Sequence, residues 1–340
     1  MQFREDMEKS RAGKAAYRDG LDALIREREA ALAEKRWEDC RDIFTEGDEH
    51  RKRFCAMLGW PLTETGKRDV PAAAAEVLGT EGEHEISRVH LEVLPGLTLT
   101  GLFFRYMTAG ESVPLVIAQH GGLGTPELIA GFYDGQTHNY NDMVERLLPH
   151  RVHVFAPQLL LWNVENYGES YDRKTVDARL KRVGSSVTAV EVYALMRVLD
   201  WAETFSSSFG MIGLSYGGFY TLFTAAVDTR IRSAVSCSFF SRRSEYPWTD
   251  WTWTNAAGLY DDAEIACLSY PRRLCVQMGD HDNLFAVEHT QAEAARVRAY
   301  CRRAGVPEDW FRCTIFDGTH ELYKGEEEIE RMMGEVRSKR

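Results

Sequence analysis

The sequence has a deficit of positive charge, with 41 lysines and arginines against 52 aspartates and glutamates among 340 residues, a formal net charge of −11. A nucleic-acid-binding protein would need a basic patch, so this class is excluded. No run reaches the ~20 apolar residues that cross a bilayer. The start, MQFREDMEKSRAGK, lacks the apolar centre of a signal peptide. We therefore expect a soluble cytoplasmic protein that binds neither nucleic acid nor membrane.

The sequence is also poor in patterns that bind metals or cofactors. Its seven cysteines are scattered without a C-x-x-C pair, which is typical of a reducing compartment. It contains no H-E-x-x-H motif, no EF-hand loop and neither of the two common glycine-rich phosphate motifs. We expect no metal and no cofactor. Hydrophobic residues make up 44% of the chain, enough for a substantial core, so a disordered protein is excluded.

The N-terminal region differs in composition from the rest of the chain. Residues 1–53 contain 27 charged side chains, yet apolar residues recur at helical spacing from Leu21 to Leu58. This pattern predicts two or three amphipathic helices that stop at Gly59-Trp60-Pro61, then a short helix over residues 71–78 and a linker at 79–82. We interpret residues 1–82 as a helical arm packed on the main domain; a homodimer contact and a partial roof over the active site are the alternatives.

Residues 83–340 have the pattern of one α/β domain. Residues 86–93 and 97–105 predict an antiparallel pair joined at Pro95-Gly96. Short apolar runs then alternate with helical patterns, which predicts a mostly parallel central sheet covered by helices on both faces. The runs are 113–119, 151–156, 209–214, 231–236, 274–278 and 311–316, and the helical patterns are 141–148, 185–203, 216–227 and 285–304.

Ser215 is the candidate nucleophile. It lies in Gly213-Leu214-Ser215-Tyr216-Gly217-Gly218, which fits the pattern G-x-S-x-G, after an apolar strand and before a helical pattern. A strand–turn–helix setting is what a nucleophile elbow requires, because the sharp turn exposes the hydroxyl and the helix N-terminus favours negative charge. A glycine-rich turn with an incidental serine is the alternative interpretation.

A serine hydroxyl needs a base to take its proton and an acid to orient that base, and in this fold the order along the chain is Ser, then Asp or Glu, then His. His320, just past the last predicted strand, is our candidate base. Asp282, in the loop after residues 274–278, is our candidate acid. The alternatives are a turn residue, Asp280, and two acidic residues one strand earlier; His281 and His289 are the other downstream histidines. The two earlier acidic residues are Glu245 and Asp250.

The oxyanion of the tetrahedral intermediate needs two backbone N–H donors. The Tyr216 N–H, directly after the nucleophile, is expected to supply one. The second is expected from Gly122 in His120-Gly121-Gly122-Leu123-Gly124, which follows an early strand. A simple glycine-rich turn is the alternative interpretation of this loop.

Aromatic residues after the strand at 231–236 are candidates for a substrate pocket. Trp248, Trp251 and Trp253 lie in a segment that often covers the serine in such domains, and their rings could stack on a sugar or enclose an aromatic group. Trp162 and His120 are further candidate pocket residues. A hydrophobic patch that attaches the segment to the domain is the alternative for the tryptophans.

Together, GLSYGG, GDHD, DGTH and the HGG loop resemble the α/β-hydrolase superfamily over residues 85–335. The segments HGGLGTPELIAGF, FAPQLLLW and GLSYGGFYTLFTAAVDTRI are similar to bacterial dienelactone-hydrolase-like and acetyl-xylan-esterase-like proteins. Dienelactone hydrolases use a cysteine nucleophile, whereas the elbow here carries Ser215, which favours ordinary carboxylic esters. The resemblance implies an α/β-hydrolase fold, with an N-terminal helical arm added.

The resulting hypothesis is a serine carboxylesterase, most plausibly an acetyl esterase for carbohydrate esters, that takes a small-molecule ester and needs no cofactor. A carbon–carbon bond hydrolase and a serine peptidase use the same triad and are alternatives. A catalytically silent binding protein with this fold is the alternative outside enzymes.

Overall fold

The computed structural model describes residues 3–64, 66, 69–107, 112–132, 138–161 and 172–338. These residues form a nine-stranded sheet in the order β1-β2-β3-β5-β4-β6-β7-β8-β9, antiparallel from β1 to β5 and parallel beyond. The mostly parallel α/β architecture that the sequence predicts is therefore confirmed. The strands are β1 (Ala73–Glu81), β2 (His84–Leu94), β3 (Leu97–Tyr106), β4 (Leu115–Gln119), β5 (His153–Pro157), β6 (Phe209–Leu214), β7 (Ile231–Cys237), β8 (Arg273–Gly279) and β9 (Phe311–Phe316).

Helices cover both faces of the sheet, and each face has its own hydrophobic core. One core joins the sheet to α2, α6, α7, α8 and α9, and the other joins it to α10 and the region around α3. Strands β4 and β6 are buried along their whole length, which explains their continuous apolar sequences. The helices are α1 (Met7–Asp39), α2 (Gly47–Leu58), α3 (Pro126–Ile129), α5 (Arg173–Lys181), α6 (Val187–Ala202), α7 (Tyr216–Val227), α8 (Asp262–Cys267), α9 (Val287–Ala304) and α10 (Glu327–Arg337).

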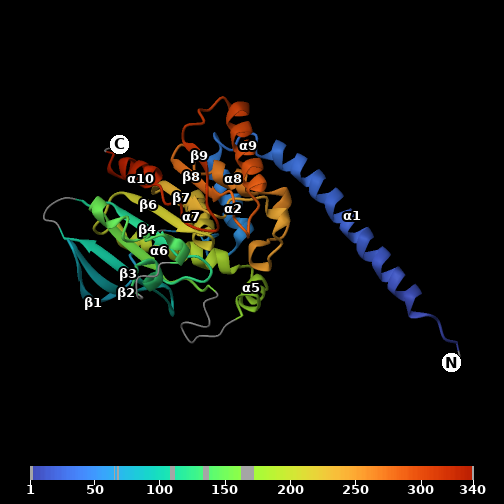
Figure 1. Cartoon of the computed structure of the whole chain (residues 1–340), viewed down its shortest axis with the longest axis horizontal. Coiled ribbons are helices and arrows are strands. Elements are labelled where there is room, and N and C mark those ends of the chain that lie inside the picture. The colour runs from blue at the N-terminus through green and yellow to red at the C-terminus, as the bar shows by residue number, and fades with distance from the viewer. Residues whose placement is uncertain are drawn as a thin grey trace.

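The N-terminal helix α1 projects away from the rest of the molecule, with the N-terminus at its far end (Figure 1). Side chains from Phe3 to Arg28 are exposed, apart from the half-buried Ala15. Only the last third of α1 packs on the body, where the Arg36 guanidinium bonds Asp261 at 2.8 Å. The last third of α1 and helix α2 thus pack on the rest of the molecule, whereas the N-terminal two thirds of α1 do not.

Two segments expected to be helical are not. Residues 73–81 form the edge strand β1, and residues 79–82, expected as a linker, are the end of β1 and the turn into β2. Pairing with β2 outweighs the helical propensity of the alanines there. Residues 141–147 form turns and Leu148 begins a short 3₁₀-helix. Asn141 and Asp142 adopt positive φ values of 46° and 57°, which an α-helix starting there does not accommodate.

The strand order brings the predicted site loops to one edge of the sheet. Gln119 at the end of β4 pairs with Gly213 in β6, and Gly279 at the end of β8 pairs with Phe316 at the end of β9. The carboxyl ends of parallel strands form the usual binding edge of such sheets. None of the helices in the described part of the chain is both long and apolar enough to cross a lipid bilayer.

Candidate active site

Ser215 occupies a strained turn between β6 and α7. Its φ of 58° and ψ of −121° lie where side chains other than glycine are rare. The neighbouring glycines make the turn sterically feasible: a Cβ at Gly213 would lie 2.3 Å from the Gly217 carbonyl oxygen, and one at Gly217 would lie 2.1 Å from that of Gln119. The glycines of the motif therefore let α7 approach β6 and β4 closely, and Ser215 stands at the point where they meet.

His320 and Asp282 form a hydrogen-bonded pair. His320 Nδ1 lies 2.8 Å from Asp282 Oδ2, with the Asp282 side chain 0% exposed and that of His320 13% exposed. The other Asp282 oxygen accepts from the backbone N–H groups of Leu284 and Phe285, at 2.8 and 3.0 Å. Burial alone would raise the pKa of Asp282, but the hydrogen bond and charge of His320 and these two N–H groups lower it below its usual value. The carboxylate is thus held ionised against the imidazole.

Asp280, the alternative acid in this loop, has a different position. Its carboxylate accepts from the Gly318 N–H at 3.2 Å, and the His281 N–H donates to the Gly318 carbonyl at 2.9 Å. A Cβ at Gly279 would lie 2.3 Å from the Thr319 carbonyl oxygen. These contacts fasten the loop of the acid to the loop of the base, so Asp280 links the loops while Asp282 bonds the imidazole.

The two acidic residues one strand earlier are elsewhere. Glu245 is exposed at the surface. Asp250 is buried and accepts from Arg173 Nε and the Tyr216 hydroxyl, each at 2.8 Å. Neither of these alternatives holds the position against His320 that Asp282 has.

The glycine loop after β4 lies against the elbow. A Cβ at Gly121 would be 3.2 Å from the Cβ of Ser215, and the Gly121 N–H donates to the Tyr140 hydroxyl at 2.8 Å. Gly122, the next residue, is partly exposed. On the other side, Tyr216 is the first residue of α7, where backbone N–H groups have no acceptor within the helix. The loop that carries Gly122 and the first residue of α7 thus both adjoin Ser215.

His120 supports the loop from beneath rather than contacting the pocket. Its ring is fully buried; Nε2 accepts from the Leu159 N–H at 3.2 Å, so Nδ1 carries the hydrogen and donates to the Gly121 carbonyl at 2.9 Å. Burial lowers the pKa of His120 to about 4, partly opposed by the hydrogen bond to Gly121. A neutral, enclosed imidazole of this kind holds the backbone in place, which corrects the expectation that His120 lines the pocket.

The three tryptophans after β7 have unequal positions. Trp251 and Trp253 are 2% and 5% exposed and belong to the core, where both stack on Phe219. Burial thus corrects the expectation that these two line the pocket. Trp248 is half-buried, with its ring 4.3 Å from that of Trp251 and stacked at 6.3 Å on Tyr216. Trp162 lies outside the described residues.

A buried polar cluster that the sequence patterns do not predict lies behind Tyr216. Arg173, Glu191 and Tyr220 meet there with Asp250, although their elements are far apart in the sequence. The available signal was Glu191, the one charged residue in the mostly apolar stretch 187–196. A buried carboxylate in such a helix requires a polar partner.

One group of side chains in the described part of the chain has the spacing of metal ligands. Asp280, His281 and Asp317 bring one ligand atom each to within 4.8 Å of one another. All three are exposed, and Asp280 already accepts a backbone hydrogen bond there. The proposed reaction assigns no role to this group.

No protein-family model and no curated protein sequence matches the chain. Solved structures share its fold. A glucuronoyl esterase from Solibacter usitatus aligns with a TM-score of 0.61 and 13% identity, over 86% of this chain and 91% of its own. Acetyl xylan esterase 1 from Thermoanaerobacterium sp. aligns with a TM-score of 0.55 and 15% identity, over 86% of this chain and 94% of its own. A cold-adapted esterase from an Arctic intertidal metagenomic library aligns with a TM-score of 0.52 and 17% identity, over 80% of this chain and 100% of its own.

These comparisons show that the chain has an α/β-hydrolase-like fold, as the sequence motifs predict. Identities of 13–17% establish the fold alone.

Proposed function

We propose that this protein is a serine hydrolase of carboxylic esters, with Ser215 as nucleophile, His320 as base and Asp282 as the acid that orients it. The observation that supports this most is the pairing of a fully buried Asp282 carboxylate with His320 Nδ1 at 2.8 Å, at the sheet edge where Ser215 occupies its strained turn. The pairing leaves Nε2 of the imidazole to act on the serine proton.

The reaction we propose is acyl transfer in two steps. His320 takes the proton of Ser215 as the hydroxyl oxygen attacks the ester carbonyl carbon, and the N–H groups of Tyr216 and Gly122 bind the oxyanion. His320 then protonates the leaving alcohol as the carbon–oxygen bond breaks. Water, deprotonated by the same base, attacks the acyl-enzyme and releases the acid and Ser215.

The substrate we propose is an acetyl ester of a carbohydrate. One comparison supports this choice: an acetyl xylan esterase shares the fold. Within the chain, Trp248 supports it, because a half-buried indole next to Tyr216 offers a flat apolar face on which a sugar ring can stack.

Intact-mass spectrometry after treatment with a fluorophosphonate, together with hydrolysis of p-nitrophenyl acetate and butyrate, tests the proposal. We expect one adduct, on Ser215, turnover of the acetate, and loss of both in Ser215→Ala. Labelling without ester turnover would favour peptide or carbon–carbon bond cleavage. A folded protein without an adduct would favour a silent binding protein.

We also propose that the protein is a cytoplasmic homodimer joined through α1. Tyr17, Leu21, Leu24 and Ile25 recur at helical spacing on the projecting part of α1 and are 41–72% exposed. A single helix is marginally stable in water, so this apolar stripe needs a partner. All seven cysteines are free thiols, which suits the reducing cytoplasm.

The charge of α1 supports a second copy as that partner. Residues 9–18 carry four basic and no acidic side chains, whereas residues 19–29 carry four acidic and two basic ones. When two copies of α1 lie antiparallel, the basic half of each faces the acidic half of the other, and the stripes Tyr17–Ile25 meet in the middle.

A further inference from the structure

The proposed reaction needs two N–H donors from separate parts of the chain at a fixed spacing. Tyr216 begins α7, and Gly122 lies in the loop after β4. Catalytic donors must be held within a fraction of an ångström of the position of the oxyanion, because a small displacement sacrifices much of their effect. This inference rests on the proposed function and concerns what fixes that spacing.

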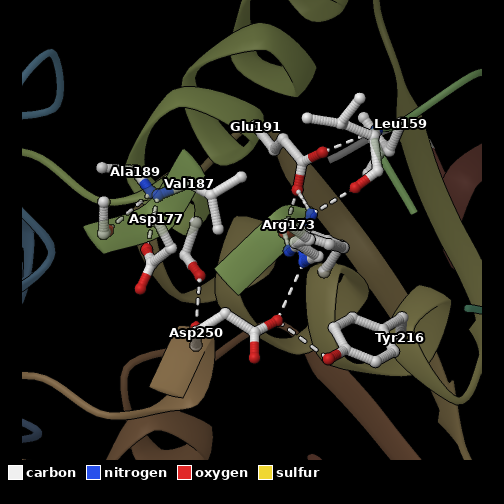
Figure 2. A network of polar contacts seen from close by, with 12 residues as sticks. Leu159, Arg173, Asp177, Val187, Ala189, Glu191, Tyr216 and Asp250 are labelled. Atoms are coloured by element: carbon white, nitrogen blue, oxygen red, sulfur yellow. Dashed lines mark hydrogen bonds and ion pairs between the residues drawn. The ribbon is translucent and has the colours of Figure 1, made fainter. Parts of the chain in front are cut away.

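A buried hydrogen-bonded chain begins at the first donor residue. The Tyr216 hydroxyl donates to Asp250 Oδ2 at 2.8 Å, and Arg173 Nε donates to the same oxygen at 2.8 Å. Figure 2 shows one Asp250 oxygen bonded both to the Tyr216 hydroxyl and to the Arg173 guanidinium. The side chains of Arg173 and Asp250 are both 0% exposed, and the guanidinium carbon lies 5.3 Å from the centre of the Tyr216 ring.

The chain continues from Arg173 to the segment after β5. Arg173 Nη1 donates to Glu191 Oε2 at 3.1 Å and also to the Leu160 carbonyl, while the Leu160 N–H donates to Glu191 Oε1 at 2.7 Å. Arg173 and Glu191 thus bind both backbone polar groups of Leu160, its carbonyl and its N–H. Figure 2 shows this contact beside Leu159.

Leu159 completes the connection to the second donor. Its N–H donates to Nε2 of the buried His120, whose Nδ1 donates to the Gly121 carbonyl, the residue before Gly122. A path of hydrogen bonds therefore runs from Tyr216 through Asp250, Arg173, Glu191 and His120 to the glycine loop, with only the Leu159–Leu160 backbone between.

The energetics indicate that this arrangement serves more than stability. Burying a guanidinium and two carboxylates costs several kcal/mol per ion in desolvation, and apolar side chains of similar volume often stabilise a fold as well or better. Burial disfavours the charge of Arg173, yet Glu191, Tyr220 and Asp250 raise its pKa well above its usual value, so it stays a cation. Asp250 Oδ2 accepts two hydrogen bonds in this network, whereas its Oδ1 is buried without a partner. A hydrogen-bonded network in a low-dielectric site is rigid and directional, which suits the positioning of other groups.

We propose that Arg173 is a positioning residue that holds the two halves of the oxyanion-binding site at a fixed spacing, through Asp250 to Tyr216 and through Glu191 and His120 to Gly122. It touches neither substrate nor Ser215. Its effect is therefore on the stabilisation of the transition state rather than on the binding of the ester.

Two conservative variants test this. Arg173→Lys keeps the charge but loses the planar set of donors, and Tyr216→Phe removes one hydroxyl while Asp250 keeps its bond to Arg173. Tyr300→Phe is the matched control, because its hydroxyl also donates to a buried carboxylate, Glu264, at 2.7 Å, in another part of the molecule.

The readouts are kcat and KM for p-nitrophenyl acetate per active site titrated with fluorophosphonate, and the Kd of phenylboronic acid, which forms a tetrahedral adduct with an active serine. We expect kcat to fall about 10- to 100-fold in both variants, boronate binding to weaken by a comparable factor, and KM to stay within about twofold. Values equal to those of Tyr300→Phe, or a change in KM alone, would overturn the role of Arg173.

Hydrogen exchange tests the connection without turnover. In Arg173→Lys we expect faster amide exchange in the loop from His120 to Gly124 and at the start of α7, with β2 and β3 unchanged. Unchanged exchange in both segments would overturn the inference even if the wild-type protein hydrolyses no ester. The absence of a Ser215 adduct in the folded wild-type protein would instead count against the proposed function.

Discussion

Asp282 Oδ2 lies 2.8 Å from His320 Nδ1, and the carboxylate that makes this bond is entirely shielded from water. The two residues come from loops after β8 and β9, which backbone hydrogen bonds at Asp280 and His281 hold together. Because the carboxylate fixes both the orientation and the tautomer of the imidazole, the pair defines which nitrogen is left for proton transfer.

Replacement of Asp282 by asparagine should lower kcat on p-nitrophenyl acetate by about 10⁴-fold, because the amide favours the wrong imidazole tautomer. Asp280→Asn is the control, two residues away in the same loop and exposed, and should retain most of the activity. Steady-state kinetics with circular dichroism checks both variants. An equal loss in Asp280→Asn would reverse the assignment of the acid.

Trp248→Ala should raise KM for acetylated xylo-oligosaccharides several-fold. It should change Tm little, because the indole is half-buried and packs on the core only on the side that faces Trp251. Trp253→Ala should instead lower the free energy of unfolding by about 3–5 kcal/mol, because a buried ring leaves a cavity. Kinetics and urea unfolding separate the two effects. A Trp248→Ala variant with unchanged KM would remove the tryptophan from the proposed pocket.

The double substitution Leu21→Asp, Leu24→Asp should convert the dimer to a monomer, because four charges would face one another across the stripe of α1. Ala23→Asp, on the opposite side of the helix, is the control and should leave the mass unchanged. Light scattering coupled to size-exclusion chromatography gives the mass. A wild-type monomer over the micromolar range would contradict the dimer, and binding of α1 to anionic vesicles would identify a membrane surface as its partner instead.

Stability should depend on pH through His120. Its folded pKa of about 4 lies below the ordinary value of 6.5, so the unfolded chain takes up the proton first as the pH falls. The contribution of the neutral His120 ring to the free energy of unfolding is complete above about pH 6.5 and decreases toward pH 4. Between pH 7 and 5 the free energy of unfolding should therefore decrease by about 2 kcal/mol. Urea unfolding at both pH values should show a smaller difference in His120→Asn. An equal difference would mean that His120 is protonated alike in both states.

Much of the fold could be predicted because its signals are local. The apolar strands of the parallel sheet, the glycines around Ser215 and the order of Ser215, Asp282 and His320 can all be read along the chain. The strand β1 could not, because its alanines favour a helix and only pairing with β2 makes them a strand.

The polar network behind Tyr216 could not be predicted either, although its residues are ordinary in the sequence. Arg173 begins α5, Glu191 lies in α6 and Asp250 follows β7, and their contacts depend on how these elements pack. Burial separates the tryptophans in the same way: Trp248 and Trp251 are three residues apart, yet only the second is enclosed by the core.

The crowding around the elbow has a consequence for how this site can evolve. A Cβ at Gly213, Gly217 or Gly218 would lie within 2.6 Å of a neighbouring carbonyl oxygen, so the surroundings of position 215 admit almost no variation. Ser215 itself is only half-buried. Lineages with this fold are therefore free to exchange the nucleophilic atom, oxygen for sulfur, far more readily than the glycines that present it, and chemistry can diverge while the frame stays constant.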